Sequence, residues 1–457
     1  MEERDVVILG GGSAGYQAAL KVSQLGGKAT LIENDALGGT CINRGCIPVR
    51  ALLRMAEMVD LTRYAKDYGV NYKETEIDLS KMISRKNIII RTLLTGLKQS
   101  FSANGVEVIE GIGRLLSPSK LEVQLKDGGR KEITARKIII ATGSEWKKPS
   151  IPGGEKIITP NELLEFKVVP KSMIIIGGGF IGASIATIFS KLGTQITLLE
   201  ESPKILHQLD REIVSIFEKE LENSKIKTYT EAHVDKVEDK GSEEKSVGVS
   251  VKGKEIQLDT QHLAVAEERV SNLKEIDLNK VGITLNDKKG IAVNRRMQTN
   301  VPTILAAGDV TMQQMWTHVA YVEGMVAAEN AMGKYTEVDY KAIPYGTHTF
   351  PEISGVGLTE EEAIVQGRQV KVEKYPFAGN SLATILGQRI GMVKIITDTK
   401  YGQILGVHMI GPQANELIAE ATVAMKLEMT LEDLSSVLHL HPTLSEIFWE
   451  VARGAIP

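Results

Sequence analysis

The chain has 457 residues, of which 42% are hydrophobic and 25% are charged, proportions typical of an ordinary globular protein. At roughly 100–200 residues per domain, this length predicts about three domains. A formal net charge of −4 argues against the basic surface of a protein that binds nucleic acid or an anionic membrane. Only two cysteines occur. This excludes a disulfide-stapled secreted scaffold and a four-cysteine zinc site, and no metal site is predicted.

The chain also lacks the usual signals for export or membrane insertion. Its first ten residues, MEERDVVILG, do not have the charged-then-apolar layout of a signal peptide. The longest apolar runs, such as Ile138–Ala141 and Met173–Ile176, are too short to cross a bilayer. We therefore expect a cytoplasmic protein.

One pattern occurs twice. Residues 6–33 read VVILGGGSAGYQAALKVSQLGGKATLIE, residues 173–200 read MIIIGGGFIGASIATIFSKLGTQITLLE, and the two align without a gap. Each copy predicts a strand, a G-x-G-x-x-G turn, a helix and a second strand that ends in Glu, which is the dinucleotide-binding βαβ unit. A single G-x-G-x-x-G often marks only a strand-to-helix turn, but two copies in register argue against that alternative.

The positions that the two copies share have defined physical roles. The first glycine permits a tight turn, the second lets the backbone approach a pyrophosphate, and the third lets the helix pack closely on the strand. In the two copies these glycines are Gly10, Gly12 and Gly15, and Gly177, Gly179 and Gly182. The terminal Glu33 and Glu200 accept hydrogen bonds from a ribose hydroxyl. Glu200 favours NAD over NADP, because a carboxylate repels a 2′-phosphate, and the sequence thus predicts two dinucleotide sites.

The two cysteines, Cys41 and Cys46, follow the first unit in the run CINRGCIP. In a regular helix, residues five positions apart rise about 7.5 Å, more than the roughly 4.4–6.8 Å between Cα atoms that a disulfide tolerates. A bond between them therefore needs an irregular backbone, which Gly45 and Pro48 can supply. We interpret the pair as a redox-active disulfide. The alternatives are two inert buried thiols or a zinc pair.

At this point the sequence resembles a known family. The run GGTCINRGCIP at 38–48, after a βαβ unit, resembles the pyridine nucleotide–disulfide oxidoreductases, in particular the dihydrolipoamide dehydrogenases, and the similarity extends over essentially the whole chain. It implies an α/β fold with two Rossmann-like dinucleotide-binding domains (the FAD/NAD(P)-binding fold) and a C-terminal α+β dimerisation domain. The implied segments are 1–147 for FAD and the disulfide, 148–271 for NAD, 272–338 to complete the FAD site, and 339–457 for the dimer interface.

Three further runs support the resemblance: KIIIATG at 137–143, TNVPTILAAGDV at 299–310 and WTHVAYVEG at 316–324. The resemblance implies that Asp309 binds the ribityl chain of the flavin and that His318 belongs to the helix under the flavin. The remaining residues that it assigns to the FAD site, besides the first βαβ unit, are Gly39, Thr40, Arg50, Thr142 and Gly143.

A histidine and a carboxylate near the end of the chain complete the predicted chemistry. Thiol–disulfide exchange needs a thiolate, so a base near neutrality must take a proton from a substrate thiol. His441 suits this role, and Glu446 could fold back across Pro442 to hold the imidazole and stabilise its charged form. His439 is then a structural neighbour. The resemblance implies that His441 serves the disulfide of the other subunit, and hence a homodimer with a shared active site.

The implied activity is the FAD-dependent oxidation of protein-bound dihydrolipoamide with reduction of NAD+ to NADH. The substrate dithiol attacks Cys41, and Cys46, nearer the flavin, passes the electrons on. The implied partner is a lipoyl-carrying protein of a 2-oxoacid dehydrogenase or glycine-cleavage type of complex. Two alternatives are a disulfide reductase of the same fold with another substrate, and an FAD-bound electron-transfer partner with impaired NAD turnover.

Two departures from the family pattern fall in the NAD half. The family pairs a Lys after the second cysteine with a Glu in the NAD-domain helix, whereas Arg50 and Ser184 occupy these positions here. We expect Arg50 to be an unpaired charge that stabilises reduced flavin; the alternative is that it finds another acceptor. Glu268 replaces the Gly of a turn near NAD and Ser271 replaces its Pro, and Glu268 is expected to weaken NAD binding unless Arg269 neutralises it or it points to solvent.

Overall fold

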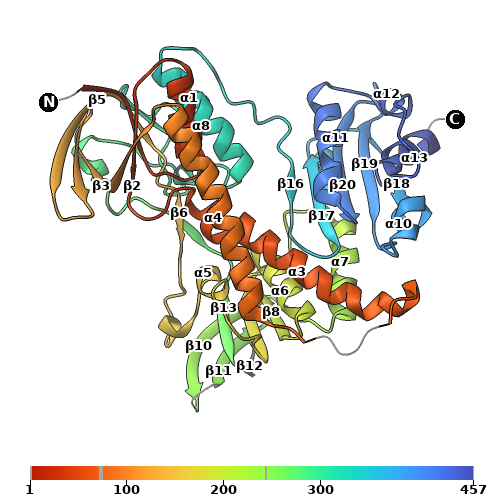
Figure 1. The fold of residues 1–457 in the computed structure, drawn as a ribbon. Helices are drawn as coiled ribbons and strands as arrows, with labels where there is room; N and C mark the ends of the chain where they lie inside the picture. Colours follow the sequence, from red (N-terminus) through yellow and green to blue (C-terminus); the bar gives the residue numbers. More distant parts are fainter. Residues whose placement is uncertain (1–2, 72–75, 242–243, 456–457) are drawn as a thin grey trace. The chain divides into compact units, whose positions relative to one another are not determined.

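The computed structural model describes residues 3–71, 76–241 and 244–455, and these form two compact units (Figure 1). The first unit consists of Met1–Pro48, Ile83–Lys147 and Glu268–Asp339. The second consists of Val49–Met82, Lys148–Glu267 and Tyr340–Pro457. Among the described residues, no helix has both the length and the apolar character needed to cross a membrane.

A parallel sheet is the core of the first unit. Its strand order is β3-β2-β1-β5-β15, with bounds β1 Glu3–Leu9, β2 Ala29–Glu33, β3 Glu107–Ser117, β5 Arg130–Ile140 and β15 Ile304–Ala306. β3 and β5 continue beyond it and pair antiparallel with β4 (Lys120–Leu125). The apolar runs of β1 and β5 are almost wholly buried, as expected for strands covered on both faces.

Helices α1 (Ser13–Gln24) and α8 (Thr317–Ala331) pack against each other in the first unit. Gly324 makes this close approach possible, because a Cβ placed on it would lie 2.2 Å from the carbonyl oxygen of Ala14. Helix α2 (Gly39–Arg44) also belongs to the first unit. The residues of α3 (Cys46–Tyr64) and α4 (Leu79–Ala103) are divided between the two units. A two-stranded pairing joins β6 (Ser144–Trp146) to β14 (Arg269–Ser271).

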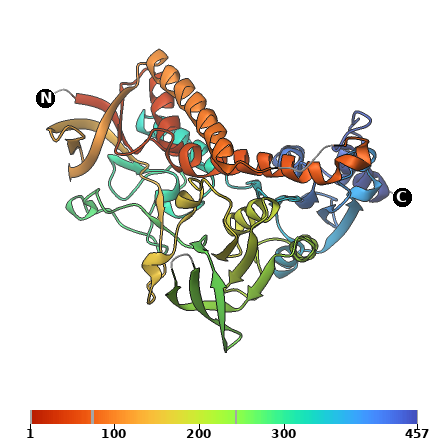
Figure 2. The ribbon, with the colours of Figure 1, turned by 60° about the horizontal axis from the view of Figure 1, so that its bottom comes forward.

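The second unit contains another parallel sheet, of order β13-β7-β8-β9. Its elements are β7 Ser172–Ile176, α6 Phe180–Lys191, β8 Gln195–Glu200, α7 Arg211–Asn223, β9 Lys227–Thr230 and β13 His262–Val265. An antiparallel layer, the green strands of Figure 2, consists of β10 Ala232–Lys240, β11 Glu244–Val251 and β12 Lys254–Thr260. The charged stretch 238–245 covers the end of β10 and the start of β11, and its residues 242–243 lie outside the described residues.

The C-terminal part of the second unit is a five-stranded antiparallel sheet with helices, drawn in blue tones in Figure 1. The strands, in spatial order, are β16 Tyr345–Gly346, β17 Glu352–Gly357, β20 Ile404–Gly411, β19 Met392–Asp398 and β18 Val370–Pro376. The helices are α9 Glu360–Val365, α10 Ser381–Ile385, α11 Ala414–Lys426, α12 Leu431–Ser435 and α13 Glu446–Ala455. The apolar faces of α10, α11, α12 and α13 share one core with the sheet, whereas α9 packs through Ala363 in a separate small cluster with Ile396 and Leu405.

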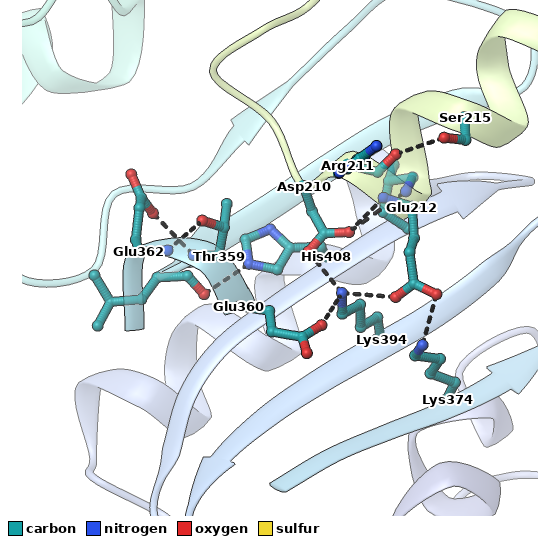
Figure 3. Close-up of polar contacts among 12 residues, drawn as sticks. Asp210, Arg211, Glu212, Ser215, Thr359, Glu360, Glu362, Lys374, Lys394 and His408 are labelled. Atoms are coloured by element: carbon teal, nitrogen blue, oxygen red, sulfur yellow. Dashed lines mark hydrogen bonds and ion pairs between the residues drawn. The ribbon is translucent and has the colours of Figure 1, made fainter. Parts of the chain in front are cut away.

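A buried ionic cluster joins the start of α7 to this sheet within the second unit (Figure 3). The ammonium of Lys394, on β19, is 2% exposed and lies 2.9 Å from Asp210, 2.7 Å from Glu212 and 2.7 Å from Glu360. Beside it, the fully buried His408 bonds to the Leu358 carbonyl oxygen, and burial lowers the pKa of His408. Buried charges are stable only when paired in this way, so the cluster holds α7 in a defined position on the sheet.

Candidate active site

The two glycine-rich loops have nearly identical geometry. Gly10 and Gly177 adopt positive φ angles of 100° and 108°, which side chains other than glycine rarely accept. A Cβ on Gly15 would lie 1.8 Å from the Gly10 carbonyl oxygen, and a Cβ on Gly182 would lie 1.8 Å from that of Gly177. Only glycine is therefore compatible with the tight turn and with the contact between helix and strand.

The middle glycines lie where a dinucleotide would approach. Gly12 and Gly179 are the N-cap residues of α1 and α6, and neither helix has a side-chain cap at that end. A Cβ on Gly179 would meet nothing within 4 Å, and one on Gly12 would meet only Gly39 Cα, at 3.8 Å. The first backbone N–H groups of a helix attract phosphate, so both loops fit a pyrophosphate group.

Glu33 and Glu200 hold these loops in shape. Glu33 accepts hydrogen bonds from the backbone N–H groups of Gly11 (2.6 Å) and Asp35 (2.7 Å). Glu200 accepts equivalent bonds from Gly178 (2.8 Å) and Ser202 (2.7 Å). The sequence pattern suggested only a ribose-binding role for these two carboxylates. Their loop contacts show that they also stabilise the phosphate-binding turn.

The cysteine pair lies beside the first loop. Gly39, at the start of α2, has a φ of 58°, and a Cβ on it would lie 2.5 Å from Gly12 Cα. Gly45 interrupts the helix between α2 and α3, which is the irregular backbone that a Cys41–Cys46 bond requires. Both cysteines are free thiols in this structure. The hydrogen bond to Cys46, together with burial, raises the pKa of the Cys41 thiol.

Thr317 is a neighbour of this pair that sequence reasoning did not single out. Its Oγ1 lies 3.5 Å from the Cys46 sulfur, and Thr317 is the first residue of α8. The expected flavin residue His318 follows it, and its ring stacks on Trp316 with centroids 6.0 Å apart. The signal for Thr317 was its place in the run WTHVAYVEG, next to a residue already assigned to the site.

Asp309 is held by two residues that the sequence did not connect to it. Its carboxylate accepts a hydrogen bond from the Ser144 hydroxyl at 2.6 Å and forms an ion pair with Arg269 at 3.1 Å. Thr142 and Gly143 lie in the neighbouring turn, where both bond to Asn272. The first unit thus brings together the residues assigned to FAD except Arg50, which belongs to the second unit.

In the second unit, His441 and Glu446 meet as predicted from their spacing. His441 Nδ1 lies 2.8 Å from Glu446 Oε1, and the Thr443 backbone N–H donates to Glu446 Oε2 at 2.7 Å. Burial raises the pKa of Glu446, but the bonds from Thr443 and His441 outweigh it and leave this pKa lowered. His441 is 70% exposed. With Nδ1 engaged by a carboxylate, Nε2 is the nitrogen that can accept a proton.

His439 is a structural neighbour of this pair. Its Nε2 lies 2.8 Å from Glu420 Oε1, and its side chain is 6% exposed. A buried and paired imidazole is not available to an external thiol, so His441 is the only one of the two that meets the requirements for a base.

The expectation that Arg50 lacks a partner is wrong, and the alternative, that it finds another acceptor, is confirmed. Its guanidinium forms an ion pair with Glu352, at the start of β17. Ser184 does not take over the missing carboxylate's role. Its hydroxyl donates to the Phe180 carbonyl oxygen at 2.7 Å and accepts from the His348 N–H at 3.1 Å. The prediction failed because Glu352 lies 302 positions from Arg50, where no local pattern could reveal it.

The second departure is also resolved. Glu268 is 58% exposed and pairs with Lys147, whose Nζ lies 2.8 and 3.0 Å from its two carboxylate oxygens. Arg269 does not neutralise Glu268, because it pairs with Asp309 and packs over the Trp146 ring. Lys147 is therefore the neutralising partner. Ser271, in place of Pro, donates a hydrogen bond to the Val310 carbonyl oxygen at 2.8 Å.

Two dinucleotide-binding modules and a thiol pair next to one of them define an oxidoreductase that exchanges electrons between a nucleotide cofactor and thiols. The chain belongs to the pyridine nucleotide-disulphide oxidoreductase family, whose model matches residues 4–324. The dimerisation domain of the same family matches residues 343–452.

Relatives and solved structures agree with this assignment. The chain is 37% identical to dihydrolipoyl dehydrogenase 1, mitochondrial, of Arabidopsis thaliana, covering 99% of this chain and 90% of that protein. It is 37% identical to dihydrolipoyl dehydrogenase of Thermus scotoductus, covering 99% and 98%. Among solved structures, the HOCl-induced flavoprotein disulfide reductase RclA from Escherichia coli, in a Cu(II) complex, matches with a TM-score of 0.90 and 26% identity over 100% of both chains.

These comparisons confirm the fold class and the resemblance that the sequence suggested. The chain is a flavoprotein oxidoreductase that uses FAD and NAD and acts on sulfur groups of donors. Its glycine loops fit these cofactors by their geometry, and its C-terminal part is a dimerisation domain of this family.

Proposed function

We propose that this protein oxidises protein-bound dihydrolipoamide to lipoamide and reduces NAD+ to NADH. The observation that carries the proposal is the position of Cys41 and Cys46 directly beside the first dinucleotide loop, in a chain whose second loop has the same geometry. The names of relatives that are 37% identical over nearly the whole chain supply the substrate class.

The proposed reaction proceeds by thiol–disulfide exchange at Cys41 and Cys46, with His441 as the base. In the oxidised enzyme, a substrate thiolate attacks Cys41, the Cys41–Cys46 bond breaks, and a mixed disulfide forms. The second substrate sulfur then displaces Cys41 and closes the lipoyl disulfide, which leaves two enzyme thiols. FAD, when bound, takes up the two electrons for transfer to NAD+ as hydride. His441 accepts the substrate proton at Nε2, and Glu446 holds the imidazole and stabilises its charged form.

The proposal includes a homodimer in which His441 of one protomer serves the thiol pair of the other. The family's dimerisation domain at 343–452 supports this. So does the exposure of two apolar side chains next to the base, since Leu438 is 96% and Leu440 is 78% exposed. Large apolar side chains exposed together are typical of an interface. The proposed partner is a lipoyl-carrying protein of a 2-oxoacid dehydrogenase or glycine-cleavage type of complex.

A cytoplasmic location remains part of the proposal. The mitochondrial label of the Arabidopsis thaliana relative is a property of that protein.

An anaerobic absorbance experiment tests the proposed function. We expect dihydrolipoamide, added to the purified yellow protein, to produce a long-wavelength band from a thiolate next to oxidised flavin. NAD+ should then remove this band as NADH accumulates. If the band forms but NAD+ leaves it unchanged, the thiol half functions without the NAD half. If no band forms, the lipoamide assignment is wrong.

A second candidate is a disulfide reductase of the same fold that uses another substrate. The structural match to RclA favours it, as does the exchange of the family's Lys–Glu pair for Arg50 and Glu352. In this case dihydrolipoamide would give no band, whereas NADH would reduce the Cys41–Cys46 disulfide and sustain reduction of an added low-molecular-weight disulfide.

A further inference from the structure

Arg50 lies close to the redox thiols along the chain. Helix α3 runs without interruption from Cys46 to Tyr64, and residues four positions apart in a helix share a face, with Cβ atoms about 5–6 Å apart. Arg50 therefore leaves the helix one turn after Cys46, on the same face. A nearby cation stabilises a thiolate, as does the helix N-terminus at which Cys46 stands.

The partner of Arg50 is more deeply buried than Arg50 itself. Glu352 is 6% exposed, whereas Arg50 is 39% exposed. Glu352 Oε2 accepts a hydrogen bond from the Asn415 backbone N–H at 3.0 Å, in the first turn of α11. The Asn415 side chain in turn donates to the Thr347 carbonyl oxygen at 2.8 Å. The carboxylate thus has a fixed position independent of Arg50, and the flexible guanidinium is drawn to it.

Ser184 gives the nucleotide-binding helix α6 no ionic contact with Arg50. At the position where the family resemblance implies a glutamate, Ser184 is 4% exposed and bonds only to backbone groups, including the His348 N–H. The Phe180 ring makes an edge contact with Tyr345, with centroids 5.9 Å apart. The cation at the other end of α6, Lys191, pairs with Asp60 of α3 at 2.6 Å and lies over the Phe350 ring. The charge opposite Arg50 itself comes from Glu352 on β17.

We propose that Glu352 is a positioning residue for the reaction, which holds the Arg50 guanidinium at the Cys46 end of α3 and partly neutralises its charge. This rests on the proposed function only in assigning a redox role to Cys46. It follows that the strand β17 of the dimerisation domain, rather than the NAD-binding helix, tunes the reactivity of the thiol pair. Titratable groups that interact with Cys46 include Cys41, Tyr16 and Tyr321.

The test uses the fact that the chain has only two cysteines. In a Cys41→Ser background, Cys46 is the single thiol, and its rate of alkylation by iodoacetamide at neutral pH reports the thiolate fraction. In the holoenzyme, Glu352→Gln keeps an acceptor for Arg50 but removes the negative charge, and we expect about tenfold faster alkylation. Glu352→Ala removes the anchor, so alkylation should be slower than in the parent, as in Arg50→Met.

The matched control is Ser184→Ala, which we expect to alter the alkylation rate less than twofold. Opposite effects of Gln and Ala at position 352 cannot arise from a merely structural role. Equal effects in the same direction, or no effect of either, would overturn the proposal. Because alkylation needs neither dihydrolipoamide nor NAD+, this outcome is independent of the anaerobic experiment that tests the proposed function.

Discussion

At the scale of single residues, several carboxylates owe their state to backbone N–H groups. Glu446 illustrates this, because its pKa is lowered by bonds from Thr443 and His441 in spite of partial burial. Its stabilising contribution is therefore present above its ordinary pKa of 4.5 and is lost as the pH falls through its lower folded value. At the pH of turnover it is a full negative charge next to the imidazole.

We expect Glu446→Gln to reduce kcat/KM for dihydrolipoamide by roughly 100-fold, because a neutral amide no longer stabilises the imidazolium. The acid limb of the pH profile should move to lower pH, and the stability lost relative to the parent should shrink as the pH falls below 4. Steady-state kinetics and thermal unfolding between pH 3.5 and 8 provide these values.

Glu420→Gln is the matched control for this prediction. It removes the carboxylate paired with the buried His439, so it should lower stability without moving the pH profile of turnover. A shift of the profile in Glu420→Gln but not in Glu446→Gln would mean that His439, and not His441, is the base.

At the scale of elements, the Lys394 cluster links α7 to the C-terminal sheet within the second unit (Figure 3). Burial lowers the pKa of Lys394, but its three carboxylate partners outweigh this and raise it. The ammonium therefore stays charged throughout the accessible pH range. Removing it would leave three carboxylates without their buried cation.

We expect Lys394→Met to lower the free energy of unfolding by about 3–5 kcal/mol, the cost of breaking a buried ion pair. Lys374→Met is the control, because Lys374 binds Glu212 at 2.6 Å but is 40% exposed, and such a pair contributes about 1 kcal/mol or less. Urea denaturation of both variants measures the difference. Similar losses of unfolding free energy in the two variants would mean that the buried cluster stabilises the fold no more than an exposed ion pair does.

At the scale of the whole molecule, the proposed homodimer makes a separate prediction. Leu438 and Leu440 flank His439 and are nearly fully exposed, so the double variant Leu438→Asp, Leu440→Asp should place charges in the interface. We expect a monomer by light scattering that keeps its FAD absorbance and loses dihydrolipoamide oxidation. Val168, 78% exposed and far from this run in sequence, gives the control Val168→Asp. A dimeric, active double variant would contradict the shared site.

The sequence by itself determined the features that depend on local geometry. The Gly10 and Gly177 turns, the close helix–strand contacts of Gly15 and Gly182, and the helix break at Gly45 all follow from conformational limits on neighbouring residues. Such limits act over a few residues and leave a readable pattern. The fold class, the two dinucleotide modules and the His441–Glu446 pair were predictable for this reason.

Only the tertiary structure decided which charges meet. Arg50 pairs with Glu352 and Glu268 pairs with Lys147, and in both pairs the partners are more than a hundred positions apart. Asp309 is held by Ser144, which is likewise more than a hundred positions away in sequence, and by Arg269. A charged side chain reaches any opposite charge within a few ångströms, so its sequence neighbours do not specify its partner. The partner depends on how strands and helices pack, and that packing turned an apparently unpaired Arg50 into a neutralised one.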